Sequence, residues 1–131
     1  MSEDNATRFR RAFDAFTKGD LETALGFVDE SFTIDDHVTP EANPTKQGPE
    51  ALVENAAYLY EVFGEVTWDP REIVDLGERV LVRVRITAKA KSNALPIEDD
   101  VGHLYTLEDG KATNLVIYRT WDEARRAAGL D

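Results

Sequence analysis

FTKGDLETALGFVDESFTIDD, the stretch from Phe16 to Asp36, changes its hydrophobic period partway along and decides the fold class. Gly19 ends one helical pattern, and Asp20 is a suitable N-cap for a second, short helix. From Phe32 onward the apolar side chains recur at every second position, which is typical of a strand with one buried face. Helices that precede the strands and stay apart from them predict an α+β protein.

The same reasoning extends to the rest of the chain. Helices are predicted at about residues 6–19, 20–28, 49–63 and 122–128, and strands at about residues 32–38, 66–74, 80–88, 100–107 and 112–121. Residues 39–47 and 92–96 are predicted loops, and Pro70 predicts an irregularity in its strand. The predicted protein is a cone-shaped, curved antiparallel (mixed) sheet with the three N-terminal helices packed on its concave face. Such a half-open cone has a natural cavity between sheet and helices.

The composition fits one domain, residues 1–131, with 42% apolar and 31% charged residues. A net charge of −11, spread along the chain, argues against nucleic acid as a partner. No apolar stretch reaches the roughly 20 residues that a membrane span needs, and the acidic N-terminus lacks the layout of a secretory signal. We therefore expect a cytoplasmic protein that does not contact membranes. The sequence has no cysteine, which excludes disulfides and thiolate sites.

Four patches of the sequence, taken in order, are similar to one known family. They are Phe16–Asp36, quoted above, GPEALVENAAYLYEVF (Gly48–Phe63), LGERVLVRVRI (Leu76–Ile86) and LEDGKATNLVIYRTWDEARRAAGL (Leu107–Leu130). Together they resemble the SnoaL-like branch of the nuclear transport factor 2-like superfamily, whose relatives include ketosteroid isomerase, polyketide cyclases and scytalone dehydratase. The resemblance implies a cystatin-like cone, a pocket for a small apolar molecule, and a homodimer through the outer sheet face. It does not fix the function, because this superfamily includes several enzyme classes and also proteins without catalysis.

Asp36 is the first candidate for a site residue. It shares its strand parity with Phe32 and Ile34, so its side chain is predicted to face the cavity. By the resemblance, it also falls where ketosteroid isomerase carries its general-base aspartate. A carboxylate in an apolar cavity suits proton abstraction beside a carbonyl group. The alternative is that the strand ends early and the carboxylate caps the following loop.

The isomerase mechanism also needs two oxyanion donors, and the resemblance places neither of them in this chain. Their positions fall at Ala12 and Gly102, which have no side-chain donor. His103 follows Gly102 and is therefore predicted to face outward, toward a dimer partner or a hydrogen bond. His37 is likewise out of phase with Asp36, and a His–Asp pair that acts through water is a further option. Two separated histidines do not predict a metal site, and we expect no cofactor.

The last strand offers Arg119 as a second candidate. It is in phase with the apolar residues of that strand, which predicts an inward side chain, and a buried arginine needs a partner. The partner would be Asp36, a carboxylate or phosphate on the ligand, or an acid at the mouth of the cone among residues 98–100. The resemblance places the cyclase acid of this strand at Thr120, so that base is absent.

The sequence therefore predicts one site and two possible functions. The catalytic candidates are Asp36 as the base, Arg119 as the orienting or charge-stabilising group, and His37 as an accessory. The predicted pocket lining is Phe16, Tyr60, Trp68, Gly102, Leu104, Leu115, Ile117, Tyr118 and Trp121. As an enzyme, the protein would be a cofactor-free isomerase, cyclase, dehydratase or hydrolase acting on a small apolar carbonyl or polyketide-like substrate. The alternative is a non-catalytic ligand-binding or dimerisation module of the same fold.

Overall fold

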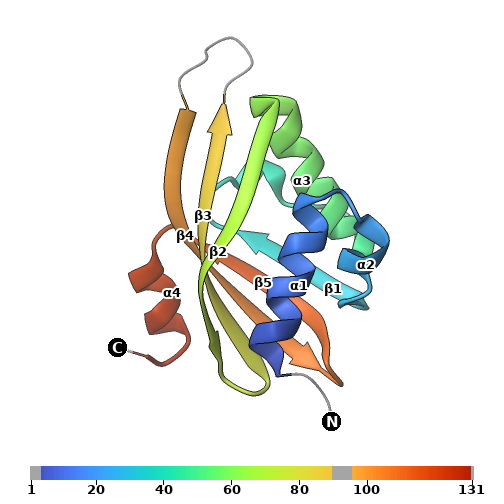
Figure 1. The fold of residues 1–131 in the computed structure, drawn as a ribbon, viewed down its shortest axis with the longest axis vertical. Coiled ribbons are helices and arrows are strands. Elements are labelled where there is room, and N and C mark those ends of the chain that lie inside the picture. The colour runs from blue at the N-terminus through green and yellow to red at the C-terminus, as the bar shows by residue number, and fades with distance from the viewer. Residues whose placement is uncertain (1–3, 90–95, 131) are drawn as a thin grey trace.

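The computed structural model of the protein describes residues 4–89 and 96–130, and Figure 1 shows how they are arranged. The helices are α1 (Asn5–Thr17), α2 (Leu21–Leu25), α3 (Pro49–Phe63) and α4 (Trp121–Ala127), with a short 3-10 helix, η1 (Pro40–Ala42), in a predicted loop. The strands are β1 (Val28–Asp36), β2 (Glu65–Asp75), β3 (Arg79–Lys89), β4 (Pro96–Glu108) and β5 (Lys111–Tyr118). The predicted order of helices and strands is confirmed.

The five strands form one curved sheet in the order β1-β5-β4-β3-β2. β1 lies parallel to β5, and the other neighbours are antiparallel, so the sheet is mixed. The helices α1, α2 and α3 cover one face, which we call the inner face, and α4 packs on the opposite, outer face (Figure 1). The predicted α+β fold with three N-terminal helices on the concave face is confirmed.

Several predicted boundaries are wrong by a few residues, and local chemistry explains two of them on β1. Val28, predicted on the second helix, belongs to β1 because the chain leaves the helix at Gly26 and turns. β1 ends at Asp36 and not at Val38, because the Asp36 carboxylate accepts the next backbone amides and so turns the chain.

Two further predictions concern irregular segments. The predicted irregularity in β2 is confirmed by a register shift between Pro70 and Glu72, where the missing proline N–H interrupts the ladder. The predicted loop at residues 92–96 lies outside the described residues, except for Pro96, the first residue of β4.

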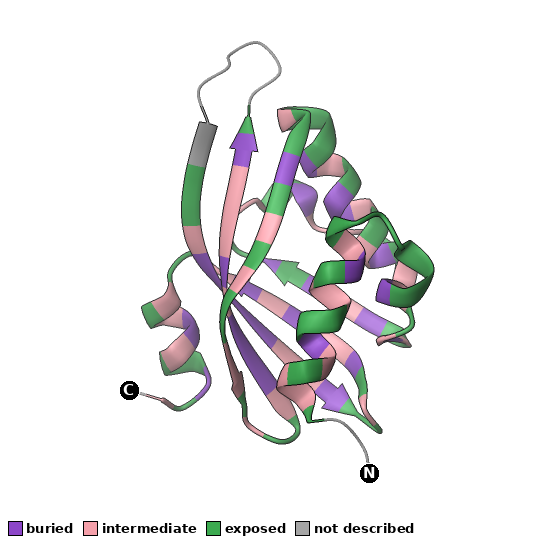
Figure 2. Ribbon diagram, in the orientation of Figure 1, coloured by how far each residue is buried: buried purple, intermediate pink, exposed green. Residues whose placement is uncertain are grey.

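The core lies between the inner face of the sheet and the first three helices. Val80, Val82 and Val84 alternate along β3 and are fully buried, as their two-residue period predicts. Phe32 of β1 is fully buried in the same cluster, and burying such a side chain stabilises the fold by about 2–3 kcal/mol. Figure 2 shows that buried positions gather along the middle of the sheet and on the helix sides that face it.

On the outer face, α4 approaches the sheet through two small residues. A Cβ atom on Gly102 of β4 would lie 2.2 Å from the Cβ of Ala124, so a residue larger than glycine would push the helix away. Leu81 and Leu104 are buried in the same cluster as Ala124 and Ala128. Part of the outer face is therefore covered from within the chain.

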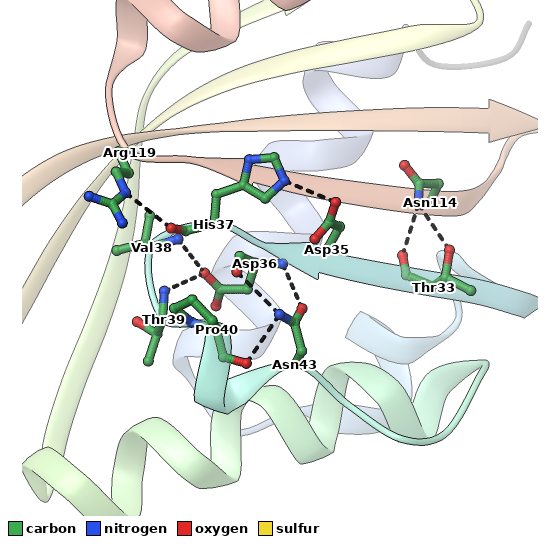
Figure 3. Close-up of polar contacts among 10 residues, drawn as sticks. All are labelled: Thr33, Asp35, Asp36, His37, Val38, Thr39, Pro40, Asn43, Asn114 and Arg119. Carbon is green, nitrogen blue, oxygen red and sulfur yellow. Dashed lines mark hydrogen bonds and ion pairs between the residues drawn. The ribbon is translucent and has the colours of Figure 1, made fainter.

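The part of the outer face that α4 leaves uncovered carries polar pairs. Asp100 of β4 accepts hydrogen bonds from two residues of β3, Nε of Arg83 at 3.2 Å and Nε of Arg85 at 2.5 Å. The Arg85 hydrogen bond in particular holds the pKa of the Asp100 carboxyl below its usual range. Thr33 of β1 accepts a hydrogen bond from Nδ2 of Asn114 on β5 at 2.9 Å (Figure 3).

Candidate functional site

A cavity of about 220 Å³ lies between the inner face of the sheet and α1 to α3. Its wall is mostly apolar, with phenylalanines from α1 and α3 opposite Trp68, Leu115 and Ile117 of the sheet. The polar side chains in the wall are those of Asp36, Thr39, Asn55, Asp99, His103 and Tyr105. The volume is below the roughly 300–1,000 Å³ that is typical of ligand sites. The cavity therefore suits a small, largely apolar molecule.

Asp36 lies at the end of β1 with its side chain in the cavity wall, and it is only 3% exposed. Its Oδ1 accepts the backbone N–H groups of Val38 at 2.9 Å and Thr39 at 2.8 Å, and its Oδ2 accepts Nδ2 of Asn55 at 3.1 Å. Figure 3 shows the carboxylate close to the loop that follows β1. The two placements predicted as alternatives therefore occur together. The Asp36 side chain faces the cavity, and it also caps the loop after β1.

Two asparagines that the sequence analysis missed hold Asp36 and its loop in place. Asn55 is buried on α3, and its Nδ2 also donates to the Ala42 carbonyl at 3.1 Å. Asn43 accepts the Asp36 backbone N–H at 2.7 Å and donates to the Pro40 carbonyl at 3.1 Å. The sequence signal for Asn55 is a polar residue on the apolar stripe of a helix, because such a residue needs a buried partner.

Arg119 does not line the cavity, which corrects the prediction from strand phase. β5 ends at Tyr118, one residue earlier, so the two-residue alternation no longer applies to Arg119. Its side chain is exposed and donates from Nε to the backbone carbonyl of His37 at 3.2 Å (Figure 3). Asp36 is held by amide N–H groups instead of by this guanidinium.

His37 also lies away from the cavity lining. Its ring is exposed, with Nε2 2.9 Å from Oδ2 of Asp35, and it meets the Tyr118 ring edge-on with 5.3 Å between centroids. This outward orientation follows from its position next to inward-facing Asp36, as the sequence predicts. In this position the His37 side chain does not reach the cavity, as the predicted accessory role would require.

His103 lies on the inner face, which corrects the outward orientation predicted for it. Val101, His103 and Tyr105 of β4 line the cavity, whereas Gly102 and Leu104 face α4. His103 is 5% exposed, and its Nδ1 lies 3.2 Å from the hydroxyl oxygen of Tyr105. Its Nε2 is buried and has no hydrogen-bond partner within the described part of the chain.

Burial sets the charge of both groups in this pair. Loss of contact with water lowers the pKa of His103 to about 3 and raises the pKa of Tyr105. Both side chains are therefore neutral at pH 7, and the cavity holds an uncharged imidazole beside an uncharged phenol. The sequence signal for this arrangement is the shared parity of His103 with Val101 and Leu107.

Of the nine predicted pocket residues, those that line the cavity are Phe16, Trp68, Leu115 and Ile117. Tyr60 is 41% exposed on α3 and meets the Trp68 ring edge-on, with 5.7 Å between centroids, without lining the cavity. The other four, which pack with α4 on the outer face, are Gly102, Leu104, Tyr118 and Trp121. Trp121 belongs to α4 and not to the strand, because Thr120 caps that helix by accepting the Glu123 N–H at 3.1 Å.

Within residues 4–89 and 96–130, no group of three or more His, Asp or Glu side chains is placed to hold a metal ion. In the same ranges, no helix is both long and apolar enough to cross a membrane.

A curved α+β fold around a small apolar cavity defines a class of small-molecule-binding proteins. Within that class, residues 9–115 match the SnoaL-like domain family, and the chain belongs to this family. The predicted membership of the SnoaL-like branch of the nuclear transport factor 2-like superfamily is thereby confirmed. No curated protein matches the chain.

Solved structures with this fold include three that are similar over most of the chain. An NTF2-like protein of unknown function from Burkholderia pseudomallei is 19% identical, with a TM-score of 0.78 over 95% of this chain and 97% of that one. TerC, co-crystallised with polyporic acid, is 22% identical, with a TM-score of 0.77 over 93% of this chain and 95% of that one. A putative SnoaL-like polyketide cyclase from Jannaschia sp. is 19% identical, with a TM-score of 0.69 over 87% and 83%. At these identities the likeness shows the fold alone.

Proposed function

We propose that this protein binds one small, largely apolar carbonyl compound in the cavity and acts on it by cofactor-free acid–base chemistry, with Asp36 as the base. The observation that carries the proposal is a buried carboxylate in the wall of an apolar cavity. A carboxylate oxygen has two lone-pair sites, and the Asn55 N–H occupies one of them on Oδ2. The second site on Oδ2 is the position from which Asp36 would take a proton.

The proposed reaction class is proton abstraction beside a carbonyl, the step that isomerisation, cyclisation and dehydration share. The apolar wall of the cavity supports a polyketide-like substrate. Two proteins with this fold were crystallised with small molecules of different kinds. TerC was crystallised with polyporic acid, and a protein of ketosteroid isomerase-like fold from Catenulispora acidiphila was crystallised with trimethylamine.

A second function, ligand binding without catalysis, is favoured by the hydrogen bonds on Asp36. Three N–H groups already occupy acceptor positions on this carboxylate, which leaves fewer of them for contact with a substrate. The absence of a side-chain donor at Ala12, which lines the cavity, points the same way. The two functions share the ligand site and differ only in whether the bound molecule reacts.

A thermal-shift screen with hydroxy-ketones, polyketide fragments, epoxides and polyporic acid would identify ligands. For each carbonyl ligand that binds, exchange of its α-hydrogens in D₂O, followed by NMR, reports proton abstraction directly. Asp36→Asn keeps an oxygen for the Val38 and Thr39 amides but removes the basic group. We expect this variant to slow exchange by about 10²- to 10⁴-fold and to change ligand affinity by less than about threefold.

Asp35→Asn is the matched control, because Asp35 is adjacent in sequence but exposed on the outer face. It should leave both exchange and affinity unchanged. Equal exchange in the wild-type and Asp36→Asn proteins, or no exchange of a bound carbonyl ligand, would contradict catalysis and leave binding as the function. The proposed homodimer through the outer face is tested separately, by sedimentation velocity over a range of protein concentrations.

A further inference from the structure

His103 and Tyr105 form a hydrogen-bonded pair in the cavity wall. They are alternate residues of β4, so both face inward. Nδ1 of His103 lies 3.2 Å from the Tyr105 hydroxyl oxygen, and the Phe13 ring lies 6.2 Å from His103 and 6.5 Å from Tyr105 between ring centroids. Nε2 of His103 is buried, and none of the residues that the structure describes is its hydrogen-bond partner.

The pair has two possible proton arrangements. In the first, Tyr105 donates its hydroxyl proton to Nδ1, and the neutral imidazole carries its own proton on Nε2. In the second, Nδ1 donates to the hydroxyl oxygen, so the hydroxyl proton and the Nε2 lone pair both lack a partner among the described residues. The first arrangement leaves one buried group unsatisfied instead of two, and each such group is costly. Nε2–H is therefore a buried donor without an acceptor among the described residues.

We propose that Nε2–H of His103 donates a hydrogen bond to a carbonyl oxygen of the ligand, and that Tyr105 is the positioning residue that fixes this tautomer. The inference rests on the proposed function and deepens it, because it requires that the ligand present an oxygen acceptor inside the cavity. Because burial lowers the pKa of His103 to about 3, the donor is a neutral N–H at pH 7. A neutral imidazole is able to polarise a carbonyl in this way.

In the proposed reaction, this donor would supply the oxyanion hydrogen bond that Ala12, in the cavity wall, cannot supply. Asp36 removes an α-hydrogen as a proton, the C–H electron pair forms the new C=C bond, and the carbonyl π pair moves to oxygen. The enolate oxygen then carries the charge, and the hydrogen bond from Nε2–H stabilises it. Return of the proton from Asp36 to a ligand carbon restores the carboxylate, so atoms and charge balance without a co-reactant.

Nitrogen-15 NMR of the histidine side chains tests the tautomer in the unmodified protein. We expect one-bond coupling to a proton on Nε2 of His103, and we expect it to persist between pH 5 and pH 8. In Tyr105→Phe, Nδ1 has lost its donor, so the proton should distribute over both nitrogens. A proton found on Nδ1 of the wild-type protein would overturn the proposal.

A matched pair of probes tests the contact with the ligand. 1-Tetralone and tetralin share one bicyclic skeleton, but only tetralone carries a carbonyl oxygen. The wild-type protein should bind tetralone about tenfold or more tightly than tetralin, and the infrared carbonyl stretch of bound tetralone should move to lower frequency. His103→Leu should abolish both differences, and Tyr105→Phe should reduce them. A structural role alone would lower stability without changing the tetralone-to-tetralin ratio.

The outcomes separate this inference from the proposed function. If both probes bind with equal affinity in the wild-type and His103→Leu proteins, the donor role is wrong and apolar binding in the cavity stands. If neither probe binds and the cavity residues show no NMR shift, the proposed function fails for this ligand class, and the donor role fails with it.

Discussion

Nδ2 of Asn55 on α3 donates to Oδ2 of Asp36 at the end of β1, with a distance of 3.1 Å between the two atoms. The same nitrogen donates to the Ala42 carbonyl at 3.1 Å, so one amide ties a strand end, a helix and the intervening loop together. Both side chains are buried. The candidate base is therefore also a structural centre, and its two contributions have to be separated by choice of substitution.

Asp36→Ala is expected to destabilise the fold much more than Asp36→Asn. Alanine leaves the Val38 and Thr39 amides and the Asn55 N–H without their acceptor, which should cost about 2–4 kcal/mol of unfolding free energy. Urea denaturation measures this difference. Asp35→Ala, at an exposed position, should change the free energy of unfolding by less than about 0.5 kcal/mol. A similar loss of stability in both variants would contradict the capping role of Asp36.

The free energy of unfolding should decrease as the pH is lowered from about 6.5 to 3, because of His103. Its folded pKa is about 3, whereas an unfolded histidine has its ordinary value of 6.5. In this window the unfolded chain takes up a proton that the folded chain refuses, so acid favours unfolding, by up to roughly 5 kcal/mol. Above pH 6.5, His103 is neutral in the folded and the unfolded chain, so it does not make stability depend on pH. His103→Leu should flatten the pH dependence above pH 4, as measured by denaturation at each pH.

Asp100 titrates in a lower window. Its pKa is lowered by Arg85 and Arg83, so its contribution is present above its ordinary value of 3.8 and is lost only as pH falls further. The remaining acid sensitivity of His103→Leu should therefore lie below about pH 4. If His103→Leu instead retained the full slope between pH 6.5 and 4, the burial of a neutral imidazole would not be its cause.

Gly102→Ala should destabilise the protein by about 1–3 kcal/mol, because the added methyl group overlaps the Cβ of Ala124. Ala124→Gly should relieve the overlap in the double variant, at a helix-propensity cost of about 1 kcal/mol. A double-mutant cycle measured by denaturation tests the contact. Additive effects of the two substitutions would show that the helix and strand do not meet here.

Arg119→Ala should leave ligand affinity and α-hydrogen exchange unchanged within about twofold. The guanidinium is exposed and donates to a backbone carbonyl on the loop, outside the cavity wall. Isothermal titration with any ligand from the screen measures the affinity. A tenfold loss would instead place this guanidinium at the ligand, as strand phase alone predicts.

The periodicity of the sequence predicted the order of the elements and the inward orientation of Asp36. It succeeded on β1 because Phe32 and Ile34 share the parity of Asp36 and both are buried. For β4, the resemblance predicted which residues face inward by aligning the chain at the hairpin between β4 and β5. The pairing of these two strands contains a register shift between Thr106 and Leu107. One additional residue reverses the faces, which exchanged Gly102 with His103.

Side-chain partners were harder to predict than strand faces. Arg119, 83 positions away in the chain, was one predicted partner of Asp36, whereas the donors that Asp36 has are two nearby amides and Asn55. Such donors depend on how tightly a loop turns, and no period in the sequence encodes that turn. The end of β5 at Tyr118 was missed for a similar reason, since Thr120 redirects the chain by capping α4.

The Gly102–Ala124 contact also limits how copies of this chain would associate. With α4 seated on the apolar cluster around Leu81 and Leu104, the rest of the outer face offers a partner groups that already have hydrogen-bond partners, such as Asp100 with Arg83. Self-association through this face would bury little apolar surface and would retain water between the copies. A dimer through this face would therefore rest mainly on polar contacts, and it would leave the cavity, on the other face of the sheet, uncovered.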